Sequence, residues 1–93
     1  MAKQAEVINK ELQETVVVGQ DSGGLVVCQF NGLGQPVSMR IGEGFKDMSA
    51  EELSMATTQA MADGHKRAQE TMMNRMSAMY ADAGVPAPPG GMP

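Results

Sequence analysis

Hydrophobic and polar positions divide the chain into a short helical pattern, three strand-like runs and one long helical pattern. In the first pattern, Ala5, Ile8 and Leu12 have the i, i+3, i+7 spacing of one helix face, and no helix-breaking residue interrupts them. We therefore predict a helix over residues 2–14. A helix this short is marginal in isolation, so it is expected to pack against the rest of the chain.

Three short runs rich in valine and other apolar residues follow, separated by glycine-containing turns. They predict strands over residues 15–20, 25–31 and 35–41. Because the connections are short, the strands are expected to pair as a three-stranded antiparallel meander. Pro36 fits only the start or the edge of its strand.

The middle strand is apolar on both of its faces, so both faces of the sheet are expected to be covered. A helix layer covers one face, and a second subunit is expected to cover the other. Val26, Cys28 and Phe30 are accordingly assigned to packing against a partner subunit.

Ser49 and Glu52 form a capping box that marks the start of a long helix over residues 50–83. Gly84 is well placed as its C-terminal cap. At a rise of about 1.5 Å per residue this helix is roughly 50 Å long, so it should project beyond so small a domain. The Pro/Gly-rich residues 85–93 are expected to form a flexible tail.

One face of the long helix carries a methionine-rich stripe whose members recur eleven residues apart, the period of a nearly straight packing helix. The stripe consists of Met61, His65, Ala68, Met72, Met76 and Met79. A structural seam is the main interpretation, and an adaptable surface for partners is the alternative. Its four methionines are assigned to dimer or partner packing. Gly64, in mid-helix, costs about 1 kcal/mol relative to alanine, which indicates a close approach of another backbone or a flexible point.

Composition favours a single small domain, residues 1–84, that is completed by a second copy. The 93 residues include no tryptophan, one tyrosine and two phenylalanines, against ten methionines. A domain of this size buries a small fraction of its surface, and a partner that binds only the folded state adds stability. We therefore expect a homodimer.

The charge balance is acidic, with seven Lys or Arg against eleven Asp or Glu and a net charge of −4. This balance argues against strong non-specific attraction to nucleic acid. No apolar run is long enough to cross a bilayer, and no secretory signal is visible, so we expect a cytoplasmic protein without membrane insertion.

The chain carries no constellation that predicts an enzyme, a metal site or a cofactor site. His65 has no partner at helical spacing, and Cys28 is a lone cysteine within a strand. Glycines occur in turns and match no nucleotide-binding motif. The basic residues of the two helices are the more informative set, because in a dimer they would be doubled: Lys3, Lys10, Lys66, Arg67 and Arg75. An ordinary solvated helix face is the alternative interpretation.

The segment GGLVVCQFNGLGQPVSMRI (residues 23–41), the first helix KQAEVINKELQE and the ending PAPPGGMP together resemble the YbaB/EbfC family of small nucleoid-associated proteins. The resemblance covers essentially the whole chain. It implies an α+β fold of order α-β-β-β-α, in which flanking helices project as arms from a dimer packed through its sheets.

The resemblance further implies binding to double-stranded DNA with little sequence preference, and an effect on nucleoid organisation or gene expression. On this chain that role falls to the five basic residues of the helices. The alternative is a non-enzymatic protein-interaction or targeting factor that uses the Met-rich helix, as in some plastid relatives. The expected location is the cytoplasmic nucleoid, or the plastid stroma if a leader has been removed.

Overall fold

The predicted order of elements is confirmed by a computed structural model, which describes residues 2–82 and Gly84. The elements are α1 (Ala2–Glu14), β1 (Val16–Gln20), β2 (Val26–Asn31), β3 (Pro36–Ile41), the 3-10 helix η1 (Glu43–Asp47) and α2 (Ala50–Asp82). Each strand begins one residue later than predicted, and η1 was not predicted. The expected tail, residues 85–93, and the last predicted helical residue, Ala83, lie outside the described residues.

Both ends of α2 form as the sequence predicts. The Ser49 hydroxyl oxygen accepts a hydrogen bond from the Glu52 backbone N–H at 3.0 Å, and a Glu52 carboxylate oxygen accepts one from the Ser49 N–H at 3.0 Å. These reciprocal bonds satisfy donors that the first helical turn leaves free. At the other end, Gly84 has a positive φ of 72° and donates its N–H to the Ala81 carbonyl at 3.1 Å. Such a left-handed residue is a common helix end.

The three strands form an antiparallel sheet in the order β1-β2-β3. Val17 lies opposite Phe30, and Cys28 lies opposite Met39. The turns are closed by short polar side chains. A carboxylate oxygen of Asp21 accepts the Val26 N–H at 2.8 Å. The middle strand β2 is therefore fixed by pairing on both of its edges.

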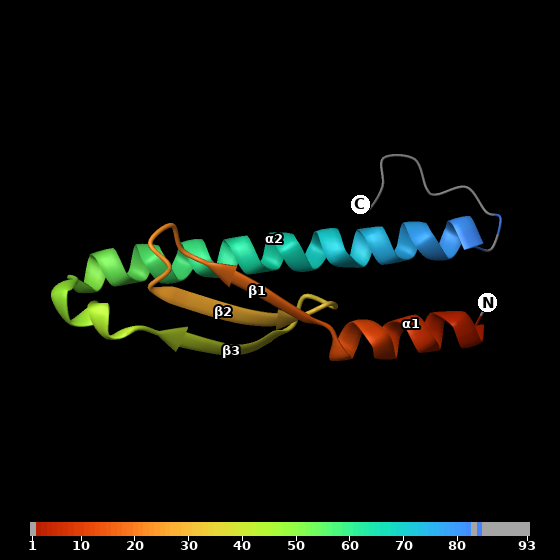
Figure 1. The fold of residues 1–93 in the computed structure, drawn as a ribbon, viewed down its shortest axis with the longest axis horizontal. Coiled ribbons are helices and arrows are strands. Elements are labelled where there is room, and N and C mark those ends of the chain that lie inside the picture. The colour runs from red at the N-terminus through yellow and green to blue at the C-terminus, as the bar shows by residue number, and fades with distance from the viewer. Residues whose placement is uncertain (1, 83, 85–93) are drawn as a thin grey trace.

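The long helix α2 covers the sheet over β1 and β2 (Figure 1). Its buried residues are small and recur every four positions: Ala56, Ala60, Gly64 and Ala68. They pack on Val17, Val26, Cys28 and Phe30, which form the core. Small residues are needed because the backbones of α2 and β1 nearly touch: a Cβ on Gly19 would lie 2.1 Å from the Gly64 nitrogen. This contact confirms the close backbone approach predicted at Gly64.

This packing corrects two expectations. The buried face of α2 shares only Ala68 with the predicted stripe: Met61 is 47% exposed and His65 is exposed, while Ala56, Ala60 and Gly64, which the stripe did not include, are buried. In addition, Val26, Cys28 and Phe30 pack in the core of this chain, under its own helix, so they do not form an open face for a partner. The reason is that β2 is the central strand and lies directly beneath α2.

Beyond the sheet, α1 runs beside the C-terminal half of α2, in the opposite direction (Figure 1). Its apolar face is buried through Ile8 and Leu12, and the Leu12 carbonyl accepts the Gly32 N–H at 2.8 Å. We call α1 together with residues 69–82 of α2 the helical arm. The molecule is accordingly elongated, with extents of 54 × 25 × 15 Å.

The edge strand β3 keeps apolar side chains exposed: Val37 at 58%, Met39 at 41% and Ile41 at 41%. Met39 and Ile41 pair with core positions of β2, so they point to the same side of the sheet as α2. They stay exposed because α2 packs over β1 and β2 instead. We call Val37, Met39 and Ile41 the β3 strip.

Candidate nucleic-acid interface

The predicted basic residues lie on the outside of the two helices. Lys3 and Lys10 are exposed on α1, and Lys66 and Arg67 are exposed on α2. Arg75 is partly buried on the arm. Lys3 and Arg75 lie close together, since both line a cavity of about 220 Å³ between α1 and α2.

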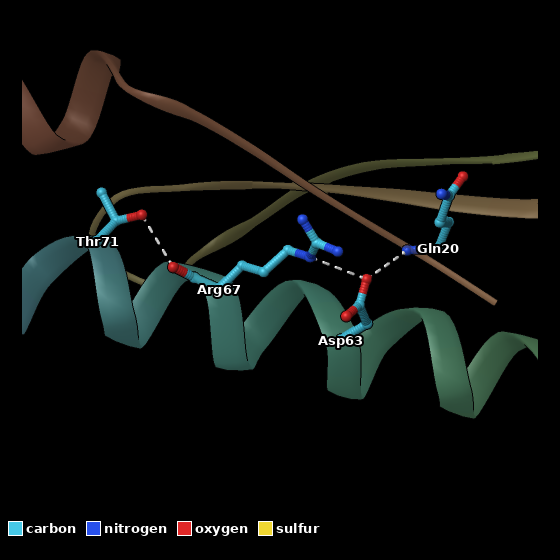
Figure 2. Close-up of polar contacts among 4 residues, drawn as sticks. All are labelled: Gln20, Asp63, Arg67 and Thr71. Carbon is cyan, nitrogen blue, oxygen red and sulfur yellow. Dashed lines mark hydrogen bonds and ion pairs between the residues drawn. The ribbon is translucent and has the colours of Figure 1, made fainter. Parts of the chain in front are cut away.

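Arg67 is held by a carboxylate of its own helix. Its Nε donates to an oxygen of Asp63 at 3.1 Å, and the same oxygen accepts the backbone N–H of Gln20 at 3.0 Å (Figure 2). These bonds, the one from Gln20 first, hold the pKa of Asp63 below its ordinary value. The carboxylate therefore stays ionised at neutral pH and links the edge of β1 to α2.

Arg75 is held by a carboxylate of the other helix. Its Nε donates to Glu11 on α1, in an ion pair that joins the two helices of the arm. The hydrogen bond to Glu11 is the main cause that raises the pKa of Arg75 above its ordinary value. The side chains of Arg75 and Glu11 are 33% and 47% exposed, so both remain open to solvent.

The lysines are more available than the arginines. In the described part of the chain, ion pairs form only at Arg67 and Arg75. Lys3, Lys10 and Lys66 thus present their charge to solvent without a carboxylate partner among these residues.

Sequence reasoning overlooked two kinds of residue at this surface. Asp63 stands four residues before Arg67, a spacing that favours an ion pair on a helix and could have been noticed. The pair of Glu11 and Arg75 spans 64 residues and had no local signal. Arg40, exposed on β3, was also not singled out; it lies opposite Val27, on the face of the sheet away from the core.

The methionines of the predicted stripe fall into two groups. Met61 is exposed, whereas Met72, Met76 and Met79 are partly buried on the arm. Met79 lines the cavity between α1 and α2 together with Val7 and Ile8. Their assignment to dimer or partner packing stays a prediction.

Other chemistry is sparse within residues 2–82 and 84. This part of the chain contains no group of three His, Cys, Asp or Glu side chains that could hold a metal ion. Cys28 is buried, and burial raises the pKa of its thiol, which disfavours the reactive thiolate. None of the helices described is long and apolar enough to cross a membrane.

The fold and its surface define a small α+β protein whose sheet carries a two-helix arm with exposed basic side chains. The chain belongs to the YbaB/EbfC DNA-binding family, whose model matches residues 1–83.

Relatives named nucleoid-associated proteins match along most of the chain. One from Koribacter versatilis is 33% identical over 91% of this chain and 86% of its own length. One from Synechocystis sp. is 29% identical over 88% of this chain and 72% of its own. A chloroplastic one from Arabidopsis thaliana is 32% identical over 85% of this chain but only 43% of its own.

The fold is also similar to a solved structure, the crystal structure of an uncharacterized protein from Helicobacter pylori. The TM-score is 0.72 at 24% sequence identity, and the match covers 88% of this chain and 84% of that one. At this identity the likeness supports the fold alone.

Proposed function

We propose that this chain is a non-enzymatic, nucleoid-associated protein that binds double-stranded DNA as a homodimer with little sequence specificity. Membership of the YbaB/EbfC DNA-binding family is the observation that carries the proposal. Nucleoid-associated relatives, including a chloroplastic one, support a place in the nucleoid. That nucleoid is in the bacterial cytoplasm or, for a plastid protein, in the stroma.

The chemistry of the surface supports contact with the DNA backbone rather than with bases. Lys3, Lys10 and Lys66 offer exposed ammonium groups that can neutralise phosphates. Stacking on single-stranded bases is disfavoured, because the chain has only three aromatic residues and Phe30 is buried. Backbone contacts carry no sequence information, which fits binding with little preference.

Two features limit the affinity. The net charge is −4, and Arg67 and Arg75 already hold carboxylates. Weak binding at low salt that declines steeply with added salt is therefore expected. A homodimer would offset this weakness, because it doubles the number of cations that one DNA molecule meets.

The β3 strip supports the homodimer. Its three apolar side chains are 41–58% exposed beside the core, although burial of such groups is the main favourable term in association. A second copy of this chain that covers the strip would bury the same residues on both subunits, as a two-fold interface requires.

A titration of a labelled DNA duplex across salt concentrations tests the proposal. At about 50 mM salt we expect a shift at micromolar protein, and at about 200 mM salt we expect most of the shift to disappear. Lys66→Glu should weaken binding and reduce the slope of log K against log salt by about 0.9 for each phosphate that the variant no longer neutralises. Lys46→Glu makes the same charge change in η1, at the end of the molecule opposite to α1 and distant from Lys66, and is the matched control (Figure 1). No shift by the wild type at about 50 mM would refute DNA binding by this chain.

A protein partner is the second candidate, and the exposure of two methionines favours it. Met55 is 69% exposed and Met61 is 47% exposed on α2. Methionine surfaces adapt to varied partners. This candidate becomes the leading one if the duplex titration is negative.

A further inference from the structure

Both arginines of α2 are occupied by carboxylates of the same chain. Asp63 accepts from Arg67 at 3.1 Å, and Glu11 accepts from Arg75. The two arginines are eight residues apart, which places them about 12 Å apart along the helix axis. The guanidinium group binds carboxylate and phosphate with the same planar array of donors, so these two anions compete for it.

Each carboxylate is itself fixed by the fold. The Asp63 oxygen that binds Arg67 also accepts the Gln20 N–H, so the backbone of β1 orients it (Figure 2). Glu11 is placed by α1, whose neighbouring residues Ile8 and Leu12 are buried. An acceptor already oriented loses little further freedom when it binds, which strengthens its competition with a ligand from solution.

We propose that Asp63 and Glu11 are built-in competitors of DNA phosphate for Arg67 and Arg75. In the free protein the two arginines are thereby paired with carboxylates. The lysines, which have no ion-pair partner among the described residues, provide the attraction to DNA. This inference rests on the proposed function, because it assigns a regulation to the same surface. It also accounts for a DNA-binding chain that keeps two of its seven cations bound to its own carboxylates.

Removal of the Asp63 or the Glu11 carboxylate should strengthen DNA binding more than the removal of another negative charge does. Asp63→Asn and Glu11→Gln each raise the net charge by one and remove an ionised partner. The matched controls are Glu51→Gln on α2, far along the helix from Arg67, and Glu14→Gln on α1, which change the charge equally and are exposed. With a labelled duplex at about 50 mM salt, we expect dissociation constants roughly two- to fivefold lower than in the controls, the range that an exposed ion pair contributes.

A double-mutant cycle separates competition from altered folding. Arg67→Gln should weaken DNA binding by the Asp63→Asn protein several-fold more than it weakens binding by the wild type, because only the released arginine reaches phosphate. The asparagine oxygen can still accept the Gln20 N–H, so β1 should remain attached. If the melting temperature of the Asp63→Asn protein is nevertheless below the assay temperature, the same cycle is run with Glu11→Gln and Arg75→Gln.

The outcomes separate this inference from the proposed function. Wild-type binding, with Asp63→Asn and Glu11→Gln no tighter than their controls, overturns the competition and leaves DNA binding standing. Weaker binding by both variants also overturns it, since the carboxylates would then position the arginines for DNA. If the wild type gives no shift at about 50 mM salt, DNA binding by this chain is refuted, and the competition falls with it even where a variant binds. If no protein binds, both proposals fall.

Discussion

At the scale of single residues, the closest approach at any described glycine is between two of them, Gly19 of β1 and Gly64 of α2. A Cβ on Gly19 would lie 2.1 Å from the Gly64 nitrogen and 2.6 Å from the Ala60 carbonyl oxygen, both of them backbone atoms. A Cβ on Gly64 would instead meet the Phe30 ring at 2.5 Å. A side chain can move more readily than a backbone, so position 64 should tolerate alanine better than position 19.

We expect Gly19→Ala to destabilise the fold by about 3 kcal/mol, the upper part of the range for overpacking. Gly64→Ala should cost less, because the gain of about 1 kcal/mol in helix propensity offsets part of the strain against Phe30. Urea unfolding followed by circular dichroism measures both. Ala62→Gly, at an exposed position of the same helix, is the control for propensity alone. Equal stability of Gly19→Ala and the wild type would contradict the observed close approach.

At the scale of elements, the start of α2 depends on the reciprocal bonds between Ser49 and Glu52. Hydrogen bonds from Ser49, through its backbone N–H first and its hydroxyl second, lower the pKa of Glu52. The folded pKa is therefore below the unfolded one. The stability that this carboxylate adds is present above the ordinary Glu pKa of about 4.3 and is lost as pH falls through the lowered value.

Ser49→Ala should destabilise the protein by about 1 kcal/mol at neutral pH, because it removes the cap. Part of the difference from the wild type should disappear as pH falls through the lowered pKa of Glu52, because the hydroxyl no longer meets an anion once Glu52 is protonated, whereas the backbone N–H at position 49 is kept in both proteins. Thermal unfolding at several pH values measures this difference. Ser54→Ala, exposed within the same helix, is the control and should change little at any pH. A difference that is constant with pH would contradict the contribution of the Ser49 hydroxyl to the ionised form of Glu52.

The elements also show what the sequence could predict. Periodicity, turn glycines and the capping box specify local structure, so the order of elements and the start of α2 were predictable from residues such as Ser49 and Gly84. The buried face of α2 was not predictable in this way. Large apolar residues usually mark the buried face of a helix, and on α2 most of the large apolar residues are methionines that lie elsewhere. The face that packs is made of alanines and Gly64, whose value lies in their small size.

The candidate site was predictable only in part, for a similar reason. Charge and helix position identified Lys66, Arg67 and Arg75 as candidates. Whether each cation is available depends on its partner, however, and the partner of Arg75 is 64 residues away in the sequence. Pairing across elements follows from tertiary packing, which no local pattern encodes.

At the scale of the whole molecule, the two faces of the sheet differ in character. The face away from the core mixes Val16 and Val18, which are 61% and 45% exposed, with the polar side chains of Gln29, Ser38 and Arg40. The β3 strip on the other face adjoins the core and is free of charged residues. Apolar surface that continues a core is the better candidate for an interface between subunits.

If a second copy covers the β3 strip, Met39→Ser combined with Ile41→Ser should convert the dimer to a monomer at micromolar concentration. Each substitution removes apolar area whose burial contributes roughly 25 cal/mol per Å² to the free energy of association. In a two-fold interface the same area is lost on both subunits. Sedimentation equilibrium of the full chain measures the change in mass. Val16→Ser combined with Val18→Ser is the matched control, because these valines are as exposed but lie on the opposite face. A monomeric control beside a dimeric Met39/Ile41 variant would place the interface on the other face. The monomer should also bind duplex DNA more weakly than the dimer, because each molecule then presents one arm instead of two.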